Sequence, residues 1–358
     1  MVHLKYEVEG ESISFACGLC QFRRSAEINI LNKNVIVTGG AGYIGSHACK
    51  ALYNAGYKPI TVDNLATGWS EAVKFGAFEK VDLLDQSALD RVFDIYEPHA
   101  VMHFAAFSQV GESVEDPAKY WRNNVIGSLN LFEACTAYNC EKVIFSSTCA
   151  TYGDQDNVVL TETSEQLPVN AYGASKRAVE EILQQMSKST GLQHVIFRYF
   201  NVAGADPAGE IGEFHQPETH LVPLILDAIA GKRDSVKIYG TDYETHDGTC
   251  IRDYVHVSDL VDAHVLGLQW LEDGGSNRVY NLGTGTGFTV REVIKCASIV
   301  TNRNVPVFEG DRRVGDCTKL VSSSELANVE LGWKPERSSL EQMITDAWRW
   351  HQLSGYRS

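Results

Sequence analysis

The sequence predicts an α/β fold, a doubly wound parallel (Rossmann-type) sheet followed by a second, smaller α/β domain. Over the first two-thirds of the chain, short runs rich in Val, Ile and Phe alternate with longer amphipathic stretches, which is the rhythm of βαβ units. The first apolar run leads into a glycine-rich turn, NVIVTGGAGYIG at residues 34–45, that opens a helical stretch. Near-continuous apolar strands separated by helices imply a parallel sheet covered on both faces.

The predicted elements follow in order along the chain. We expect strands at 34–38, 58–62, 78–81, 100–105, 142–147 and 194–200, and helices at 44–54, 118–137 and 175–188. A connector rich in Gly, Pro and Asp follows, and after it the smaller lobe is predicted from helices near 221–230, 258–272 and 290–300 and strands at 236–239 and 279–282. The predicted division is therefore residues 1–33 as an N-terminal extension of unknown role, 34–200 as the sheet domain and 201–358 as the second domain.

Length and composition exclude several classes of protein. At 358 residues, the chain exceeds the size at which single cores usually stop growing. A content of 44% hydrophobic and 22% charged residues is that of a globular protein, and a net charge of -15 repels a phosphate backbone, so no nucleic-acid partner is expected. The most apolar stretches fall well short of the roughly 20 residues that cross a bilayer, and no secretory signal is apparent. We expect a cytoplasmic protein without a membrane partner.

The nine cysteines are odd in number and scattered, so we interpret them as reduced thiols. Cys17 and Cys20 form a CxxC, but no second Cys/His pair with zinc spacing follows. We therefore predict no metal site. Cys149 is interpreted as a small buried hydrophobe, since nothing in the sequence marks it as activated.

The glycine-rich turn has the pattern of a dinucleotide-binding site. Gly39 permits a tight turn, Gly42 lets the backbone approach a pyrophosphate, and Gly45 lets the helix pack on the strand. About twenty residues later the next strand ends at Asp63, where a carboxylate accepts hydrogen bonds from ribose hydroxyls and repels a 2′-phosphate. Strand, glycines, helix and acid together favour NAD over NADP.

A second pattern predicts acid–base chemistry. Tyr172 and Lys176 lie four residues apart at the start of a helical stretch, so their side chains emerge on one face. A nearby ammonium, helped by the positive ring of an oxidised nicotinamide, would depress the pKa of the phenol. The strand that ends at Ser146, Ser147 and Thr148 brings hydroxyls to the carboxyl edge of the sheet, where ligands of open α/β sheets bind.

These segments carry a family resemblance that spans about residues 34–352. The glycine-rich turn, FSST at 145–148, YGASK at 172–176, RYFN at 198–201 and RDYVHV at 252–257 resemble the extended short-chain dehydrogenase/reductase superfamily. Within it, VGES at 110–113, NNV at 123–125, YGDQ at 152–155 and GTCIRDY at 248–254 resemble the UDP-glucose 4-epimerase family. The resemblance implies an NAD-dependent isomerase that converts UDP-glucose and UDP-galactose through a transient 4-keto sugar. It also implies a homodimer, for which the two long helices offer a four-helix contact.

The resemblance also implies roles for individual residues. Tyr172 would be the base that takes the sugar 4-hydroxyl proton, Lys176 its electrostatic partner, and Thr148 the hydroxyl that bridges sugar and tyrosine. The implied cofactor contacts are Gly39, Gly42, Tyr43, Ile44, Gly45, Asp63, Asn64, Asp82, Leu83, Phe104, Ala105, Ala106, Asn123 and Tyr199. The implied nucleotide-sugar contacts are Asn201, Leu221, Tyr239, Arg252, Tyr254, Arg313, Asp316 and Leu320. The arginines suit this role independently, because a guanidinium clamps phosphate oxygens in a bidentate manner.

Two alternatives stay open. Another nucleotide-sugar enzyme of the same fold, a 4,6-dehydratase or a decarboxylase, would share the oxidation at C4. A dehydratase is expected to carry an Asp–Glu pair after Thr148, where this chain has Cys149 and Ala150. A non-catalytic NAD-binding sensor would share the scaffold, because fold does not determine function.

Overall fold

The structure is a computed structural model that describes residues 33–155, 159–313, 317–353 and 355–356. Asp316, Cys17 and Cys20, named above, lie outside the described residues, as does nearly all of the proposed N-terminal extension. Within the described residues, none of the helices combines the length and the apolar character needed to cross a membrane.

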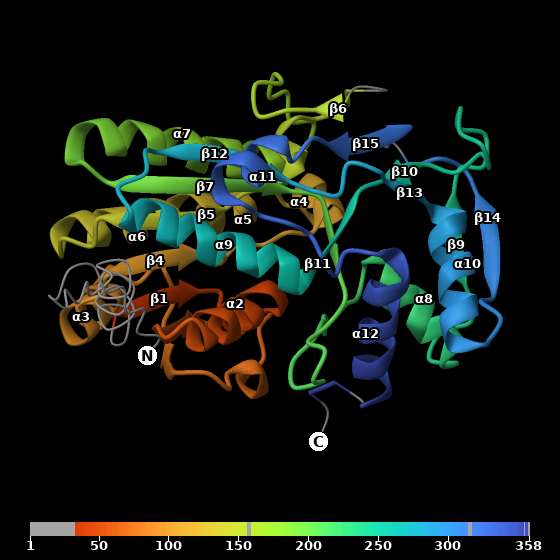
Figure 1. Cartoon of the computed structure of the whole chain (residues 1–358), viewed down its shortest axis with the longest axis horizontal. Helices are drawn as coiled ribbons and strands as arrows, with labels where there is room; N and C mark the ends of the chain where they lie inside the picture. The colour runs from red at the N-terminus through yellow and green to blue at the C-terminus, as the bar shows by residue number, and fades with distance from the viewer. Residues whose placement is uncertain (1–32, 156–158, 314–316, 354, 357–358) are drawn as a thin grey trace, which may run out of the picture.

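The larger part of the molecule is built on a seven-stranded sheet with the order β12-β7-β5-β4-β1-β2-β3. Every neighbouring pair in it is parallel. This confirms the doubly wound parallel sheet that the sequence predicts (Figure 1). The strands are β1 (Asn34–Thr38), β2 (Lys58–Asp63), β3 (Ala77–Lys80), β4 (Ala100–His103), β5 (Lys142–Ser146), β7 (Gln193–Tyr199) and β12 (Arg278–Leu282).

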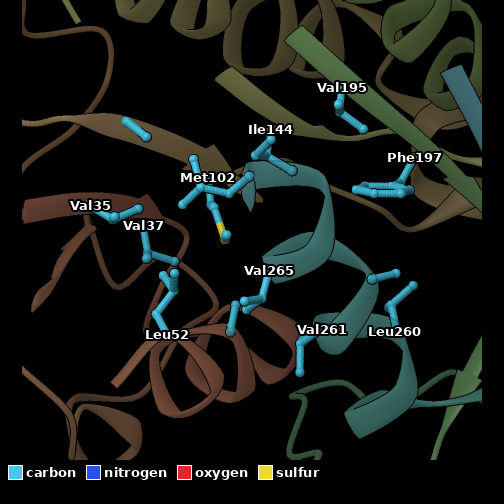
Figure 2. Close-up of a cluster of buried hydrophobic side chains, with 14 of the residues drawn as sticks. Val35, Val37, Leu52, Met102, Ile144, Val195, Phe197, Leu260, Val261 and Val265 are labelled. Atoms are coloured by element: carbon cyan, nitrogen blue, oxygen red, sulfur yellow. The ribbon is translucent and has the colours of Figure 1, made fainter. Parts of the chain in front are cut away.

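Two hydrophobic cores cover the two faces of this sheet, because successive strand side chains point to opposite faces. Val35 and Val37 belong to the first core and Ile36 to the second. The first core, part of which Figure 2 shows, packs the sheet against α2 (Tyr43–Asn54) and α9 (Val257–Glu272). The second packs it against α3 (Gln86–Tyr96), α6 (Gly127–Ala137) and α7 (Ala171–Thr190).

The smaller lobe has its own core and lies beyond the carboxyl edge of the sheet (Figure 1). Its helices are α8 (Leu221–Ile229), α10 (Val290–Thr301) and α12 (Leu340–Gln352), and α11 (Glu325–Leu331) packs back on α9 and β12. A four-stranded sheet has the order β13-β10-β15-β6, and two parallel pairs are β11 with β8 and β14 with β9. These strands are β6 (Val159–Leu160), β8 (Asn201–Ala203), β9 (Val236–Tyr239), β10 (Ile251–Arg252), β11 (Tyr254–His256), β13 (Phe288–Thr289), β14 (Val307–Gly310) and β15 (Lys319–Ser322).

The placement of two elements corrects the sequence analysis. It assigned residues 258–272 and 279–282 to the smaller lobe, but α9 packs on α2 and on the seven-stranded sheet, and β12 forms the edge strand of that sheet beside β7. The chain crosses from the large part to the small lobe after β7 and returns to complete the sheet. Helical periodicity and apolar strands identify elements but not their partners, since pairing between distant strands is a tertiary choice.

Most predicted elements are present within two residues of their expected ends, and the largest difference concerns the helix expected at 118–137. The structure has α4 (Val110–Glu115), α5 (Pro117–Tyr120), a π-helical turn η2 (Trp121–Ile126) and then α6. The sequence analysis did not anticipate α3, α4, α11 or α12. A π-helical turn within an α-helix often marks a functional position, and η2 carries Asn123 and Asn124.

A buried ion pair ties α7 to the sheet. Glu180 on α7 and Arg198 on β7 have side chains only 2% and 5% exposed, with Arg198 Nη2 2.6 Å from Glu180 Oε2 and Nε 3.0 Å from Oε1. Arg198 Nη1 also donates to the Tyr152 hydroxyl, which in turn donates to Asn281 on β12. Since an unpaired buried charge is costly, this network holds three elements at fixed positions.

We predict that Arg198→Met destabilises the fold by about 3–5 kcal/mol, because it leaves the Glu180 carboxylate buried without its cation. The matched control is Arg278→Met on β12. Arg278 pairs with Glu330 at 2.9 Å but its side chain is 37% exposed, so its removal should cost less than about 1 kcal/mol. Urea denaturation of the three proteins measures both changes, and equal effects at the two sites would contradict this account.

Candidate active site

The predicted site residues gather where the parallel strands end. The carboxyl ends of β1, β2, β4, β5 and β7 meet at one edge of the sheet, and the strand order reverses between β1 and β4. Ligands of open α/β sheets bind at such a switch point. The predicted cofactor contacts all lie on the segments that follow these strands and β3, at the start of α2, or on η2.

The turn between β1 and α2 is shaped by close backbone approach. Gly39 has φ +71°, and a Cβ there would come within 2.6 Å of the backbone nitrogen of Ala105. A Cβ on Gly45 would lie 2.1 Å from the Gly39 carbonyl oxygen. Gly42 is the N-cap residue of α2, and no described side chain hydrogen-bonds to that cap. The helix N-terminus is thus open to an anion, which its N–H groups and dipole favour.

Acidic and amide groups border this turn at the ends of β2 and β3. Asp63 is 9% exposed and accepts hydrogen bonds from the backbone nitrogens of Ala41 (3.0 Å) and Leu65 (2.8 Å). Burial raises the pKa of Asp63 from its ordinary value, while those two hydrogen bonds lower it. Asn64 donates to Asp82 at 3.0 Å. Leu83, next to Asp82, would be 3.2 Å from a Cβ on Gly127, so it packs against the start of α6.

Three predicted cofactor contacts follow β4, and three more lie at the start of α2 and the end of β7. Phe104 stacks near His264 of α9 with ring centroids 4.9 Å apart, and Ala105 and Ala106 are partly buried. Tyr43, the first residue of α2, donates its hydroxyl to the Gly204 carbonyl at 2.7 Å, and Ile44 packs against the first core. Tyr199 ends β7 and shares a 2.5 Å hydrogen bond with Ser146.

The three predicted catalytic residues come together across α7 and the end of β5. Thr148 is the second residue after β5, while Tyr172 and Lys176 occupy the first two turns of α7, whose N-cap Asn170 accepts from Gly173 N. Thr148 hydrogen-bonds to the Tyr172 phenol. Lys176 is 4% exposed and donates to the Ser146 carbonyl at 2.8 Å.

The proton affinities of this group are set mainly by burial. Burial lowers the pKa of Lys176 to about 7, with Glu180 one turn away opposing that shift. Burial, followed by Tyr199, raises the pKa of Tyr172 above its ordinary value, and the Thr148 hydrogen bond acts in the opposite direction. In the chain alone, the net shift of the Tyr172 pKa is therefore upward. Burial also raises the pKa of Cys149 to about 12, which fits an unactivated thiol.

Asn124 is a site residue that the sequence analysis quoted in a motif but did not select. It is 1% exposed, accepts from Phe107 N at 2.9 Å, and donates to Phe107 O and to Ser175 Oγ at 3.1 Å each. The predicted Asn123 donates to Asn124 at 2.9 Å. Asn124 thus fixes the segment after β4 to the first turn of α7. The surrounding sequence, YWRNNVIGSLNL at 120–131, mixes polar and apolar residues and gives no signal that separates Asn124 from Asn123.

Five of the predicted nucleotide-sugar residues, namely Asn201, Tyr239, Arg252, Tyr254 and Leu320, lie on strands of the smaller lobe. Arg252 on β10 and Leu320 on β15 are register partners, and Leu320 and Cys149 both pack against the small core of Tyr152, Leu160 and Phe200. Asn201 on β8 and Tyr254 on β11 are also register partners.

Two more of the predicted nucleotide-sugar residues, Leu221 and Arg313, are described by the structure. Leu221 at the start of α8 belongs to the core that contains Tyr254. The Arg313 guanidinium lies 4.4 Å from the Tyr239 ring centroid, and both residues are exposed. The described residues therefore place Arg252 and Leu320 beside the catalytic group, and Tyr239 with Arg313 as a separate exposed pair.

Comparison with known proteins assigns the fold and site to a family. Residues 35–283 match the model of the NAD dependent epimerase/dehydratase family. The chain is similar to a UDP-glucose 4-epimerase of Rhizobium meliloti, with 48% identity over 89% of this chain and 97% of the relative.

Solved structures agree. The crystal structure of UDP-glucose 4-epimerase from Brucella ovis in complex with NAD superposes with a TM-score of 0.87 and 48% identity, over 88% of this chain and 97% of that chain. The enzyme of that name from Bifidobacterium longum, in complex with NAD⁺ and UDP, gives a TM-score of 0.85 and 34% identity over 90% and 98%.

We predict that Gly45→Ala removes bound NAD and lowers the free energy of unfolding by about 1–3 kcal/mol, the usual effect of overpacking. The added Cβ would meet the Gly39 carbonyl oxygen at 2.1 Å, so the turn has to move. NAD released from the denatured protein and a urea titration report the two effects. Gly111→Ala on α4 is the control, because nothing lies within 4 Å of its Cβ position. Undiminished NAD content in Gly45→Ala would contradict the proposed turn geometry.

We predict that cofactor-free Lys176→Met is stabilised relative to the parent most strongly below pH 7. The pKa of Lys176 is about 7 in the folded chain, below its ordinary value of 10.5. Between these two pH values the folded state therefore binds fewer protons than the unfolded state. The loss of stability that Lys176 causes in the parent is therefore complete below pH 7. It shrinks as the pH rises toward 10.5, by up to about 1.4 kcal/mol per pH unit. Urea denaturation from pH 6 to 9.5 measures the difference between the two proteins.

Lys50→Met is the control for this experiment. Asp206 and Glu210 hydrogen-bond to Lys50 and raise its pKa above 10.5, so its stability difference from the parent should stay level across the same range. A level difference for Lys176→Met as well would show that the lysine keeps an ordinary pKa.

Proposed function

The chain belongs to the NAD dependent epimerase/dehydratase family, and we propose that it interconverts UDP-glucose and UDP-galactose by inverting C4 of the hexose. The observation that carries this proposal is the convergence of Thr148, Tyr172 and Lys176 beside a dinucleotide-binding turn. Relatives with 42–48% identity over about nine-tenths of the chain bear the name UDP-glucose 4-epimerase.

The turn at Gly39, Gly42 and Gly45 fits NAD, since side chains there would occupy the space beside the helix N-terminus. We assign the pyrophosphate to the start of α2 and the adenosine ribose to Asp63. NAD held there would supply reversible hydride transfer at C4 of the sugar, with no net redox change.

The proton chemistry falls to the chain itself. Tyr172 accepts the O4 proton of the sugar, and Thr148, hydrogen-bonded to that phenol, positions the hydroxyl. Burial raises the pKa of Tyr172, so a positive charge close to the phenol is needed for it to act as a base near neutrality. Lys176 supplies one such charge when protonated, and its pKa of about 7 lets it respond to the charge of its neighbours.

Inversion requires the ketone to turn over while the UDP stays bound. We assign the diphosphate to Arg252 and Arg313, because a planar guanidinium binds phosphate oxygens in a bidentate manner. Asn201, Leu221, Tyr239, Tyr254, Asp316 and Leu320 are proposed as the remaining contacts. Strong anchoring at the diphosphate leaves the hexose free to rotate, which is the combination that 4-epimerisation needs.

The alternative activities differ at the strand end. A 4,6-dehydratase needs an acid–base pair for elimination, and Cys149 and Ala150 occupy those positions. The raised pKa of Cys149 gives no proton donor of ordinary acidity there. Retention of Thr148, Tyr172 and Lys176 together argues against a non-catalytic sensor.

We also propose a cytoplasmic homodimer in which α7 and the α5–η2–α6 run meet their counterparts in a second copy. Apolar side chains on this side are exposed, namely Val110, Val114, Trp121, Ile126, Leu167 and Val169. Such a patch fits an isologous contact, because a two-fold axis lets one surface cover itself. The two proposed domains, 34–200 and 201–358, fit the separate cores if β12 and α9 are counted with the first.

We predict that the purified protein, holding its own NAD, converts UDP-galactose to UDP-glucose, and that Tyr172→Phe lowers kcat by about 10²–10⁴-fold. The affinity for UDP should stay unchanged, because the substitution removes no UDP contact. Thr148→Ala should lose less activity. A coupled assay for UDP-glucose and UDP titration calorimetry provide the measurements.

Two results would overturn this proposal. Formation of a 4-keto-6-deoxy sugar without epimerisation would show that the protein is a 4,6-dehydratase instead. Parent-like turnover in Tyr172→Phe would remove Tyr172 from the role of base.

We predict that Leu320 gives a strong but incomplete preference for plain over N-acetylated UDP-hexoses. Leu320 packs against the same small core as Cys149, the residue after Thr148, so a larger residue there should reduce the space for a C2 substituent. Leu320→Tyr should lower the ratio of kcat/KM for UDP-N-acetylglucosamine to that for UDP-glucose, and Leu320→Cys should raise it. Each change should correspond to about 1–3 kcal/mol in activation free energy. Thermal unfolding of each variant controls for damage to the small core around Leu320. An unchanged ratio in both variants would show that Leu320 does not border the sugar.

A further inference from the structure

The connector between β8 and α8 brings four metal-ligating side chains together. Glu213, His215, Glu218 and His220 each offer one ligand atom, and these atoms all lie within 4.8 Å of one another. The sequence analysis treated this segment as a connector and predicted no metal. The connector is the green segment between α2 and α12 in Figure 1.

The four groups alternate around a common centre. His215 Nδ1 lies 3.3 Å from Glu213 Oε1 and 3.5 Å from Glu218 Oε2. His220 Nδ1 lies 3.0 Å from Glu213 Oε1 and 2.9 Å from Glu218 Oε1. Each imidazole nitrogen thus faces both carboxylates. Two donors bound at about 2.0–2.1 Å to a tetrahedral ion stand about 3.3 Å apart, which is close to this spacing.

Burial distinguishes this cluster from a set of surface ion pairs. The side chains of Glu213 and Glu218 are only 8% and 12% exposed. His215 Nδ1 is buried and lies near both carboxylates, but it has hydrogen-bond geometry to neither. A cation held between these groups would satisfy the nitrogen and both carboxylates together.

Contacts from both parts of the molecule hold the ligands in place. Glu218 Oε1 accepts the backbone N–H groups of Thr219 and His220, at 2.7 Å each. The Trp350 indole on α12 donates to the Glu213 carbonyl, and the Trp69 indole donates to the carbonyl of the next residue, both at 3.0 Å. Such support of the ligands from outside is typical of built metal sites.

We propose that Glu213, His215, Glu218 and His220 bind one divalent transition-metal ion, Zn²⁺ being the best fit, in a closed structural site. Two nitrogen and two oxygen donors suit Zn²⁺, whereas Ca²⁺ and Mg²⁺ take oxygen ligands. Four protein ligands fill a tetrahedral shell and leave no position for substrate. The side chain of His220 is 46% exposed, which gives the ion a route of entry.

The position of the site defines what the ion would do. The His215 ring stands edge-on to Tyr43, the first residue of α2, with centroids 6.4 Å apart. His220 is the N-cap residue of α8. The ion would therefore fix the connector between the start of α2 and the start of α8. This role does not depend on the proposed epimerase activity.

Metal analysis of the tag-free protein tests the proposal without any variant. The protein is stripped with a chelator, dialysed, and titrated with Zn²⁺ alone. We expect one Zn²⁺ per chain by elemental analysis, a rise in Tm when Zn²⁺ is restored, and a tetrahedral d–d spectrum when Co²⁺ replaces it. Each readout is independent of turnover and of NAD.

Variants locate the ion. His220→Ala removes a half-exposed ligand that the fold tolerates, and Glu218→Gln keeps the shape of its side chain. Both should lose stoichiometric Zn²⁺ and the Zn²⁺-dependent part of Tm. His246→Ala is the matched control, since His246 pairs with Glu292 at 3.4 Å in an exposed position outside the cluster and its variant should bind Zn²⁺ as the parent does.

Two results would overturn the proposal. If the stripped parent takes up no stoichiometric Zn²⁺ and its Tm ignores both chelator and metal, the cluster is an ion-pair network only. If His220→Ala and Glu218→Gln retain the same Zn²⁺ content as the parent, the ion binds elsewhere.

Discussion

The geometry of the candidate site depends on one buried carboxylate, that of Glu180. It accepts hydrogen bonds from Ser147 at the end of β5, from Gln166 before α7, and from Arg198 on β7. A buried charge has to be met by fixed partners, because an unsatisfied one is costly. The helix that carries Glu180 therefore has one position relative to β5 and β7. Lys176 and Tyr172 lie on the same helix, one and two turns before Glu180, so their placement against Thr148 follows from the Glu180–Arg198 ion pair.

The same helix places Lys176 in a low-dielectric environment next to a compensating charge. Burial alone lowers the pKa of Lys176, and Glu180 limits the shift. A lysine poised near neutrality changes its charge readily when a neighbouring group ionises, and this coupling suits a residue that assists the tyrosine in proton transfer. Structural and chemical roles are thus linked through a single ion pair on α7.

The parallel sheet supplies the second constraint. Its strands all end at one edge, and the reversal of order between β1 and β4 opens a crevice there. The chain leaves this edge after β7, builds a small lobe, and returns with α9 and β12. The connector that makes the first crossing contains Glu213, His215, Glu218 and His220 and is held by Trp69 on one side and Trp350 on the other. This connector therefore joins the two parts of the molecule.

The sequence by itself determined the fold class, the position of nearly every strand of the main sheet, and the residues of the dinucleotide turn and of the Tyr172–Lys176 pair. These follow from local rules, since periodicity, glycine spacing and one-turn separation are properties of neighbouring residues. Only the tertiary structure decided that β12 completes the main sheet, that η2 turns Asn124 inward, that Tyr172 is buried enough to raise its pKa, and that two Glu and two His residues converge. Each of these depends on contacts between segments far apart in the chain or on the path of an irregular loop, and no local pattern encodes them.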